Sequence, residues 1–205
     1  MRKICIISPS LKIGGIQREL VELANLYSRI DSVYFLTVFD SPKFYELDDK
    51  VKLIDLSNYR EKKESVIQQA VYYFKLLIKL RLNVNKLKPD AVLTYGDVMG
   101  PLVLSSLIGA SHRVFIGDKT SHDYKFKFPI KQLKSFLYPF SSGYIAQTQK
   151  AAEYRQNEFK GKLKITVINN GIRDVKIYPT IPRGKNILYL GRFAWEKSPE
   201  RLIEA

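Results

Sequence analysis

The sequence has little cysteine and histidine. Its 205 residues include one cysteine, Cys5, and two histidines. One cysteine excludes an intramolecular disulfide, and its place inside the apolar stretch KICIIS predicts a buried side chain rather than a reactive thiol. No cluster of cysteine, histidine and acidic residues has the spacing of a metal site, so we expect neither a metal nor another cofactor. This cysteine usage is typical of a reducing compartment.

Long hydrophobic runs and a secretory leader are also lacking. No apolar stretch approaches the roughly 20 residues that cross a membrane, and the apolar segment after Met1 is too short for a leader. We therefore expect a cytoplasmic protein. The Gly-Lys-Ser or Gly-Lys-Thr of a Walker phosphate loop is missing as well, which argues against that kind of nucleotide site.

Acidic residues are scarce relative to basic ones. The chain has 20 Asp and Glu against 34 Lys and Arg, a formal net charge of +14. Such a surplus favours an anionic partner, namely nucleic acid, an anionic membrane surface or phosphorylated small molecules. No nucleic-acid-binding motif accompanies the charge, so we expect no nucleic acid partner.

What the chain does contain is an alternation of strands rich in β-branched residues with amphipathic helices. Strands are predicted at 3–8, 33–39, 51–56, 91–95, 113–117, 143–147 and 163–168. Helices are predicted at 15–30, 65–88, 98–110, 130–140 and 148–159. This alternation predicts an α/β fold, a doubly wound Rossmann-like parallel sheet with helices on both faces.

The composition changes near the end of the chain. Residues 169–186, NNGIRDVKIYPTIPRGKN, are rich in turn formers and have neither the helical nor the strand period, so we interpret them as a linker after a domain at 1–168. Residues 187–205, ILYLGRFAWEKSPERLIEA, predict a new strand, turn and helix, and no helix stop signal follows. We expect these residues to be the start of a truncated second domain.

Four stretches resemble, in order along the chain, the blocks of retaining glycosyltransferase family 4. They are GGIQRELVELANLY, YIAQTQKAAEY, VINNGI and ILYLGRFAWEKSPERLIEA. Members of that family are two-domain GT-B enzymes that use nucleotide sugars. The resemblance implies that 1–168 is the acceptor-side domain and that 187–205 begins the nucleotide-sugar-binding domain.

The resemblance also implies four residues that hold the donor diphosphate. Arg192 and Lys197 match the family's phosphate-binding arginine and lysine, and Gly14 and Gly15 match its glycine loop. The chemistry suits these types, because negative charge grows on the leaving diphosphate and fixed cations or backbone N–H groups stabilise it. Glycines let the N–H groups of a helix N-terminus approach a phosphate closely.

The glycine pair has two other interpretations. One is a tight turn between strand and helix. The other is a dinucleotide site, which Asp40 favours because it ends the second strand, where an acid could hold a ribose. Against the dinucleotide, GGIQRE lacks two of the three glycines of the G-x-G-x-x-G fingerprint.

Candidate acceptor-side residues follow other strands. Asp97 in TYGD, Asp118 and His122 lie after strand ends, the side on which such sheets bind ligands, so we name them as candidate catalytic residues. Asp97 has the alternative role of capping the helix predicted from Val98. Arg18 is expected to reach out from the first helical turn, toward phosphate or solvent. Many family members have a histidine at the strand end where this chain has Gly117 and Asp118.

Basic and aromatic residues are interleaved in two segments, 60–88 and 119–140. One interpretation is a helix whose apolar stripe is core and whose lysines are solvated. The other is a surface that meets anionic lipid head groups, which makes the protein peripheral on the inner face of a membrane.

These observations together predict a transferase. The resemblance implies transfer of a hexose-type sugar, with retention, from a nucleotide-diphosphate sugar to a carbohydrate or lipid-linked acceptor, in surface polysaccharide (capsule or lipopolysaccharide) biosynthesis. Most of the donor site would lie beyond Ala205, so we expect the 205-residue chain alone to be inactive. The alternative is a non-catalytic Rossmann-like module that binds a phosphorylated ligand or a membrane.

Overall fold

The computed structural model describes residues 1–58, 65–120, 124, 126, 128–171, 184–185, 187–191 and 198–204. The chain divides into two compact units, Met1–Asn170 and Gly171–Ala205, and each is described by itself. Most of the linker predicted at 169–186 lies outside the described residues.

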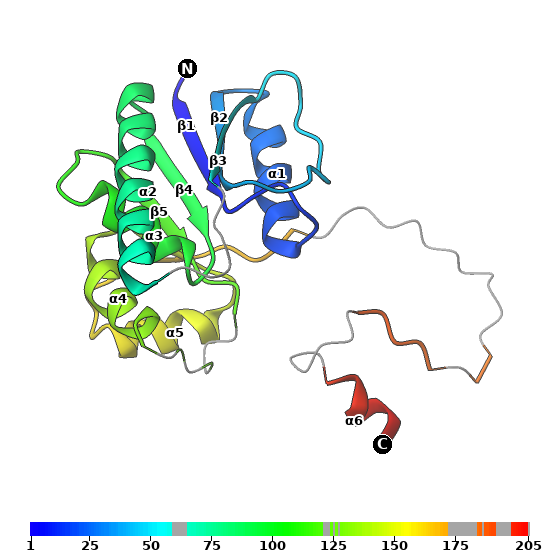
Figure 1. Ribbon diagram of the computed structural model, residues 1–205. Helices are drawn as coiled ribbons and strands as arrows, with labels where there is room; N and C mark the ends of the chain where they lie inside the picture. The colour runs from blue at the N-terminus through cyan, green and yellow to red at the C-terminus, as the bar shows by residue number, and fades with distance from the viewer. Residues whose placement is uncertain are drawn as a thin grey trace. The chain divides into compact units, whose positions relative to one another are not determined.

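The first unit is built on a seven-stranded sheet in which every pairing is parallel (Figure 1). The strands are β1 (Lys3–Ser8), β2 (Ser32–Phe39), β3 (Lys52–Asn58), β4 (Ala91–Tyr95), β5 (Val114–Gly117), β6 (Gly143–Ala146) and β7 (Ile165–Val167). Their order across the sheet is β3-β2-β1-β4-β5-β6-β7. The order reverses direction beside β1, as in doubly wound folds, so the predicted fold class is confirmed.

Helices connect successive strands, except β2 and β3, which residues 40–51 join without a helix. They are α1 (Gly15–Tyr27), α2 (Val66–Leu87), α3 (Met99–Leu107), α4 (Ile130–Leu137), the short 3-10 helix η1 (Tyr138–Phe140) and α5 (Gln149–Glu158). The helix predicted to reach residue 30 ends at Tyr27, and Ile30 is exposed in the following turn. That turn is closed by hydrogen bonds from the N–H groups of Ile30 and Asp31 to the carbonyl oxygen of Tyr27.

Both ends of α2 follow from local chemistry. The Ser65 hydroxyl accepts from the Gln68 N–H, and the Gln68 side chain accepts from the Ser65 N–H, which forms a capping box. At the other end Lys88 adopts a left-handed conformation with φ of 50°, and Pro89 follows. A proline cannot continue the helix, so the chain turns into β4.

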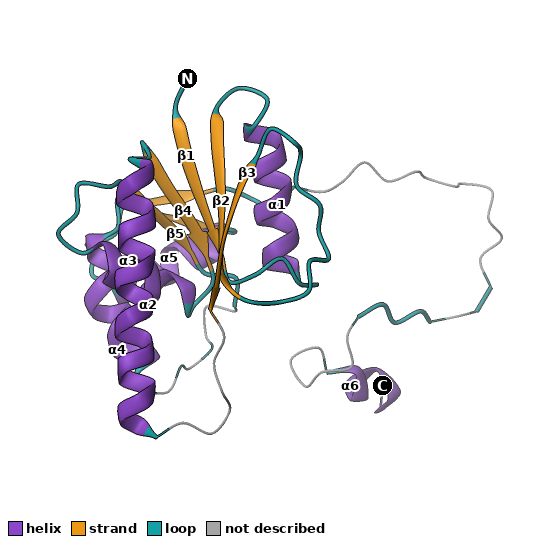
Figure 2. Ribbon diagram, turned by 45° about the horizontal axis from the view of Figure 1, so that its top comes forward, coloured by secondary structure: helices purple, strands orange, loops and turns teal. Residues whose placement is uncertain are grey.

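The sheet separates two hydrophobic cores, and Figure 2 shows α1 on one side with α2, α3 and α4 on the other. The smaller core joins Leu20, Val21 and Ala24 of α1 to β1, β2 and β4. The larger core joins α2, α3, η1 and α5 to the opposite side chains of the sheet, and it includes Cys5. Burial raises the pKa of the Cys5 thiol to about 12, so the predicted structural role of this cysteine holds.

The described part of the second unit contains the helix α6 (Pro199–Glu204). The strand predicted from residue 187 is not formed in the described stretch 187–191, where Ile187, Leu188 and Leu190 are exposed. A strand needs a partner to satisfy its backbone groups, and the described residues of this unit hold no other strand to pair with. Across the described chain, no helix is long and apolar enough to cross a membrane.

We expect α2 to show how unevenly the two sides of one helix contribute to stability. Leu80 is fully buried, whereas Leu82 on the same helix is 62% exposed. Leu80→Ala leaves a cavity and should lower the free energy of unfolding by about 2–5 kcal/mol. Leu82→Ala, the matched control, should change it by less than about 0.5 kcal/mol. Urea denaturation of both variants checks this, and equal effects would contradict the packing of α2.

Candidate functional site

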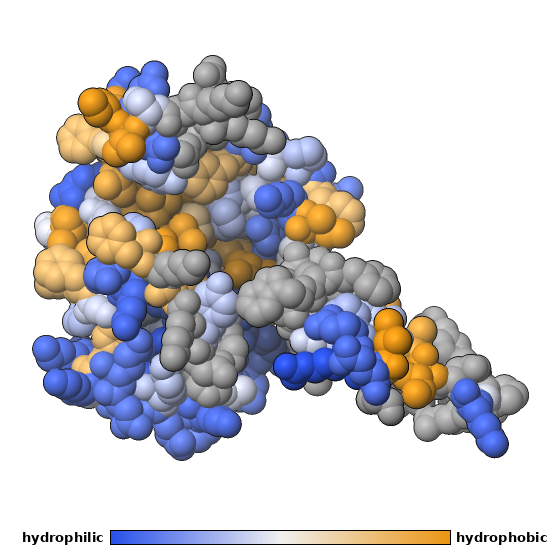
Figure 3. Space-filling view, turned by 60° about the horizontal axis from the view of Figure 1, so that its bottom comes forward, coloured by the Kyte–Doolittle hydropathy of each residue, from blue (hydrophilic) through white to orange (hydrophobic). Residues whose placement is uncertain are grey.

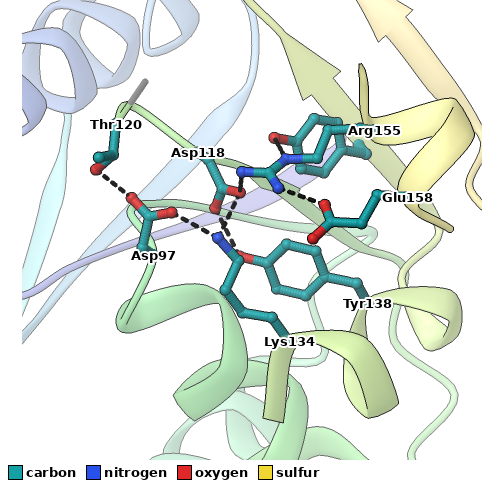
Figure 4. A network of polar contacts seen from close by, with 8 residues as sticks. Asp97, Asp118, Thr120, Lys134, Tyr138, Arg155 and Glu158 are labelled. Carbon is teal, nitrogen blue, oxygen red and sulfur yellow. Dashed lines mark hydrogen bonds and ion pairs between the residues drawn. The ribbon is translucent and has the colours of Figure 1, made fainter. Parts of the chain in front are cut away.

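Two buried carboxylates lie at the ends of neighbouring strands and share one lysine (Figure 4). Asp97 follows β4 and Asp118 follows β5, and because the strands are parallel both reach the same edge of the sheet. Lys134, from α4, places its Nζ 2.6 Å from Asp97 Oδ1 and 2.8 Å from Asp118 Oδ2. The lysine is only 4% exposed, so the ion pairs are shielded from water.

The ion pairs continue from Asp118 into α5. Arg155 Nη2 lies 2.8 Å from Asp118 Oδ2, and Arg155 Nη1 also pairs with Glu158. The resulting chain alternates in sign: Asp97, Lys134, Asp118, Arg155, Glu158. The first four are buried and Glu158 is exposed at the end of the series, and we call these five residues the buried charge chain. It ties α4 and α5 to the carboxyl edge of the sheet.

Two tyrosines complete the contacts of the buried charge chain. The Tyr138 hydroxyl donates to Asp118 Oδ1 at 2.6 Å, and the Tyr144 hydroxyl accepts from Arg155 Nε at 3.2 Å. Gly100 of α3 lies against Tyr138, since a Cβ on Gly100 would sit 3.1 Å from the tyrosine oxygen. The absence of a side chain at this position therefore gives Tyr138 its room.

Burial and neighbouring charge shift the pKa values of these groups. Burial, and then the negative charge of Asp97, raise the pKa of Asp118, while Lys134 and Arg155 act to lower it. Burial and Asp118 raise the pKa of Tyr138 well above its ordinary value, so its hydroxyl keeps its proton and acts as a donor. Burial acts to lower the pKa of Arg155, but the charge of Asp118 and the contacts with Tyr144 and Glu158 together outweigh it and raise the pKa.

The segment 118–120, which follows β5, is held at each of its residues. Asp118 is engaged as described above. The Lys119 Nζ lies 2.6 Å from Glu19 Oε1 of α1 and 4.0 Å from the centre of the Tyr95 ring. The Thr120 hydroxyl donates to Asp97 Oδ2 at 2.5 Å. These contacts fix the positions of residues 118–120.

A pocket of about 150 Å³ opens beside this segment. Its walls are residues 118–120, the end of β6 with Gln147 and Thr148, and the side chains of Ala151 and Arg155 on α5. Thr148 caps α5 by accepting from the Ala151 N–H. Hydroxyl, amide and charged groups in one small pocket suit a ligand with several hydroxyl groups. Among the described residues no group of three or more His, Cys, Asp or Glu could hold a metal ion.

Gly14 and Gly15 open α1, and the structure gives no packing reason for either. Gly14 has an extended φ of 167°, and a Cβ there would meet only the tip of the flexible Gln17 side chain. A Cβ on Gly15 would have no atom within 4 Å. The helix has no side-chain cap, and its first intrahelical bond runs from the Arg18 N–H to Gly14 O. The Gly14 N–H donates to the Tyr45 hydroxyl, so free space borders the uncapped donors of the helix N-terminus from Gly15 onward.

Of the remaining residues predicted to belong to the site, one lies in the described part of the chain and three lie outside it. Arg18 is half exposed and pairs with Glu22 at 3.7 Å. His122, Arg192 and Lys197 lie outside the described residues.

The alternative role of Asp97 as a helix cap is wrong. α3 begins at Met99, its N-cap is Val98, and no side chain caps it. Both carboxylate oxygens of Asp97 accept from Lys134 and Thr120 instead. With both oxygens engaged by these tertiary partners, the Asp97 side chain does not cap the helix.

The space around Gly117 explains why this strand end has no histidine. A Cβ on Gly117 would lie 2.8 Å from the backbone oxygen of Ile145 and 3.1 Å from the Tyr95 ring. No side chain fits there.

Sequence analysis missed Lys134 and Arg155, although a signal was present. Lys134 lies in line with Ile130 and Leu137, and Arg155 lies in line with Ala152 and Phe159, at helical spacing. Each therefore interrupts an apolar stripe with a charge. A charged residue in such a stripe is buried with its helix face and needs an opposite charge.

The fold is that of the N-terminal half of GT-B glycosyltransferases. Sucrose-phosphate synthase from Thermosynechococcus elongatus superposes with a TM-score of 0.66 at 13% identity, over 84% of this chain and 49% of that one. The apo form of the lipopolysaccharide outer core galactosyltransferase WaaB superposes with a TM-score of 0.64 at 12% identity, over 90% and 50%. No protein-family model matches the chain.

A curated relative from Campylobacter jejuni is similar over the whole chain. It is named GalNAc-alpha-(1->4)-GalNAc-alpha-(1->3)-diNAcBac-PP-undecaprenol alpha-1,4-N-acetyl-D-galactosaminyltransferase. The two are 22% identical over 206 residues, which cover 100% of this chain and 56% of the relative. This chain spans about half the length of each of these three proteins.

We expect Gly15 to be dispensable for folding. Gly15→Ala should leave the free energy of unfolding unchanged or raise it by up to about 1 kcal/mol, because alanine is the better helix former and has space. Gly117→Ala is the contrasting variant and should lower it by about 1–3 kcal/mol, since the backbone must shift. Denaturant titrations measure both. Clear destabilisation by Gly15→Ala would mean that this glycine has a structural purpose.

Proposed function

We propose that this chain is the acceptor-side half of a retaining glycosyltransferase. The observation that carries the proposal is an uncapped helix N-terminus, opened by two glycines that packing does not require, in the N-terminal fold of GT-B enzymes. The similarity to the Campylobacter jejuni transferase runs through the whole chain and supports the same conclusion.

The donor is a nucleotide-diphosphate sugar. In the proposed reaction its diphosphate approaches the helix mouth at Gly14 and Gly15 and accepts from the Gly15 N–H, since the Gly14 N–H donates to the Tyr45 hydroxyl. Arg192 and Lys197 supply positive charge. Each of these groups stabilises the negative charge that develops on the leaving phosphate. Hydrogen-bond donors that are already in position before the reaction lower the energy barrier most. The backbone N–H groups of a helix N-terminus are held in position in this way.

The acceptor occupies the edge that carries Arg18, Asp97, Asp118 and His122. Asp97 and Asp118 each use both carboxylate oxygens on protein donors. This geometry favours them as residues that shape the acceptor site over residues that take a proton. The pocket beside the segment 118–120 has the polar lining that a sugar ring requires.

The acceptor is a carbohydrate, and we infer that it is linked to a lipid diphosphate. The relative's name describes a PP-undecaprenol acceptor, and WaaB is named for the lipopolysaccharide outer core. The protein's place would then be surface polysaccharide assembly.

A lipid-linked acceptor requires access to a membrane, and α2 offers a suitable surface. One stripe of this helix packs into the core through Leu76, Leu80 and Val84. A second apolar stripe at helical spacing is exposed: Ile67, Val71, Phe74, Ile78 and Leu82. Lysines are interspersed along the same helix. On the side of the molecule drawn in Figure 3, apolar side chains are exposed among hydrophilic ones. Basic and apolar groups together suit an anionic membrane surface and a protein peripheral to it.

Vesicle binding tests the membrane surface. Phe74 is 65% exposed on α2, and Phe74→Ser should weaken binding of the protein to phosphatidylglycerol vesicles by about tenfold, the effect of losing one inserted aromatic side chain. Leu26→Ser on α1, on the opposite side of the sheet, is the control and should have no effect. Equal binding by all three proteins, or equal binding to neutral vesicles, would contradict the proposal.

A donor screen tests the transfer itself. The whole protein is given each common sugar nucleotide with a lipid-linked glycan, and release of nucleoside diphosphate is followed. Arg192→Ala and Lys197→Ala should each lower turnover by about 10²–10³, the effect of losing one charged stabiliser. Gly15→Ala should lower it without loss of stability, because its Cβ enters the space beside the phosphate.

The donor screen also distinguishes a glycosyltransferase from the alternative, a non-catalytic binding module. A non-catalytic module would bind a nucleotide or vesicles with no release of diphosphate from any donor. Unchanged turnover in both Arg192→Ala and Lys197→Ala would contradict the assigned diphosphate site.

A further inference from the structure

The buried charge chain is an unusual way to pack helices on a sheet. Removing charges from water costs free energy that their mutual attraction barely recovers, and apolar residues of similar volume often stabilise a fold equally well. Stability alone does not account for four charges of alternating sign in this interior. Their directional contacts do something that apolar side chains cannot, which is to fix positions.

What they fix is the segment 118–120. Asp118 is held through Lys134, Arg155 and Tyr138. Thr120 is held through Asp97, and Asp97 is in turn held by Lys134. Within the described residues, Lys134 is the side chain that contacts both carboxylates, so both ends of the segment depend on it.

We propose that Lys134 is a positioning residue whose buried ammonium holds the segment 118–120 against Asp97 and so orients the acceptor-facing edge of the site. The role of this edge in binding the acceptor rests on the proposed function. The contacts by which Lys134 holds the segment rest on the geometry alone. Lys134 does not contact substrate in this scheme. It acts through Asp97 and Asp118.

Removal of the ammonium has a defined electrostatic consequence. Lys134→Met keeps most of the side-chain volume but leaves Asp97 facing Asp118 with no cation between them. Two like charges this close either move apart or share a proton. Other charged and titratable groups face this point: Arg155 and Glu158 from α5, Tyr138 from η1 and Tyr144 from β6. Arg155 reaches Asp118 alone and cannot replace Lys134 at Asp97.

Whether the two carboxylates of Lys134→Met repel each other or share a proton determines how the activity of this variant depends on pH. At low pH the two carboxylates of the variant share a proton, a hydrogen bond replaces the lost ammonium, and the segment returns to its place. At high pH both are ionised, they repel, and the segment moves. Activity of the variant should therefore fall as pH rises, by up to tenfold per pH unit for a single proton.

The test measures kcat/KM for sugar transfer by the whole protein between about pH 6 and pH 8. Lys134→Met should be about 100-fold slower than wild type at the upper limit, as expected for reacting groups displaced by about 1 Å, and should recover on acidification. Lys131→Met, an exposed lysine of the same helix, is the control and should follow the wild-type profile. Hydrogen exchange of the amides of 118–120 should accelerate in Lys134→Met in the same pH range.

A second variant covers the case in which Lys134→Met does not fold. Asp97→Asn with Lys134→Met removes one of the two like charges, and the amide oxygen still accepts from Thr120. This double variant should fold, and its kcat/KM should exceed that of the single variant at high pH and vary little with pH. A double variant no faster than a folded single variant, or unfolded itself, would overturn the proposal.

The remaining outcomes separate the two proposals. A folded Lys134→Met with the wild-type kcat/KM and profile, or with a loss that is the same at every pH, would overturn the positioning role. If wild type transfers no sugar from any donor, the proposed function fails, and hydrogen exchange then decides about Lys134. Unchanged exchange at 118–120 would overturn its role, and pH-dependent acceleration would support it.

Discussion

The carboxyl edge of this sheet depends on one buried ammonium between two carboxylates. Lys134 Nζ lies 2.6 Å from Asp97 and 2.8 Å from Asp118, at the ends of adjacent strands. Two acids could not remain ionised side by side in this interior without a cation, and α4 carries that cation to them. Arg155 adds a second cation from α5. The loops that follow β4 and β5 are therefore joined to the helices that cover the sheet.

The parallel topology decides where this edge faces. All strands end on the same side, so the mouth of α1, the segment 118–120 and the pocket beside it belong to one edge. The α1 mouth presents uncapped N–H groups in open space, which suit a phosphate, and the rest of the edge presents side chains that suit hydroxyl groups. The two chemistries are those that a sugar donor and a sugar acceptor require.

The fold was predictable from the sequence because strand and helix periods alternate clearly through residue 168. The end of α1 was misplaced because Ile30 continues the apolar period into a turn. The strand expected from residue 187 failed for a different reason, since apolar period alone forms no strand without a partner.

The site was only partly predictable. Asp97 and Asp118 were found because they follow strands, and Gly14 and Gly15 because two glycines at a helix mouth are costly. Their partners were not, since Lys134 is separated from Asp97 by 37 residues and the pairing depends on how α4 packs. Local propensity would also have made Asp97 a helix cap, and the tertiary ion pair overrode it.

A crystal structure of the whole protein with a nucleotide-diphosphate sugar tests the central claim most directly, namely that this edge of the sheet is one side of a sugar-transfer site. We expect the diphosphate at the α1 mouth, where it accepts from the Gly15 N–H, with Arg192 and Lys197 beside it. We also expect the sugar to face the segment 118–120, with Lys134 still between Asp97 and Asp118. A nucleotide bound away from the carboxyl ends of the strands would contradict this claim.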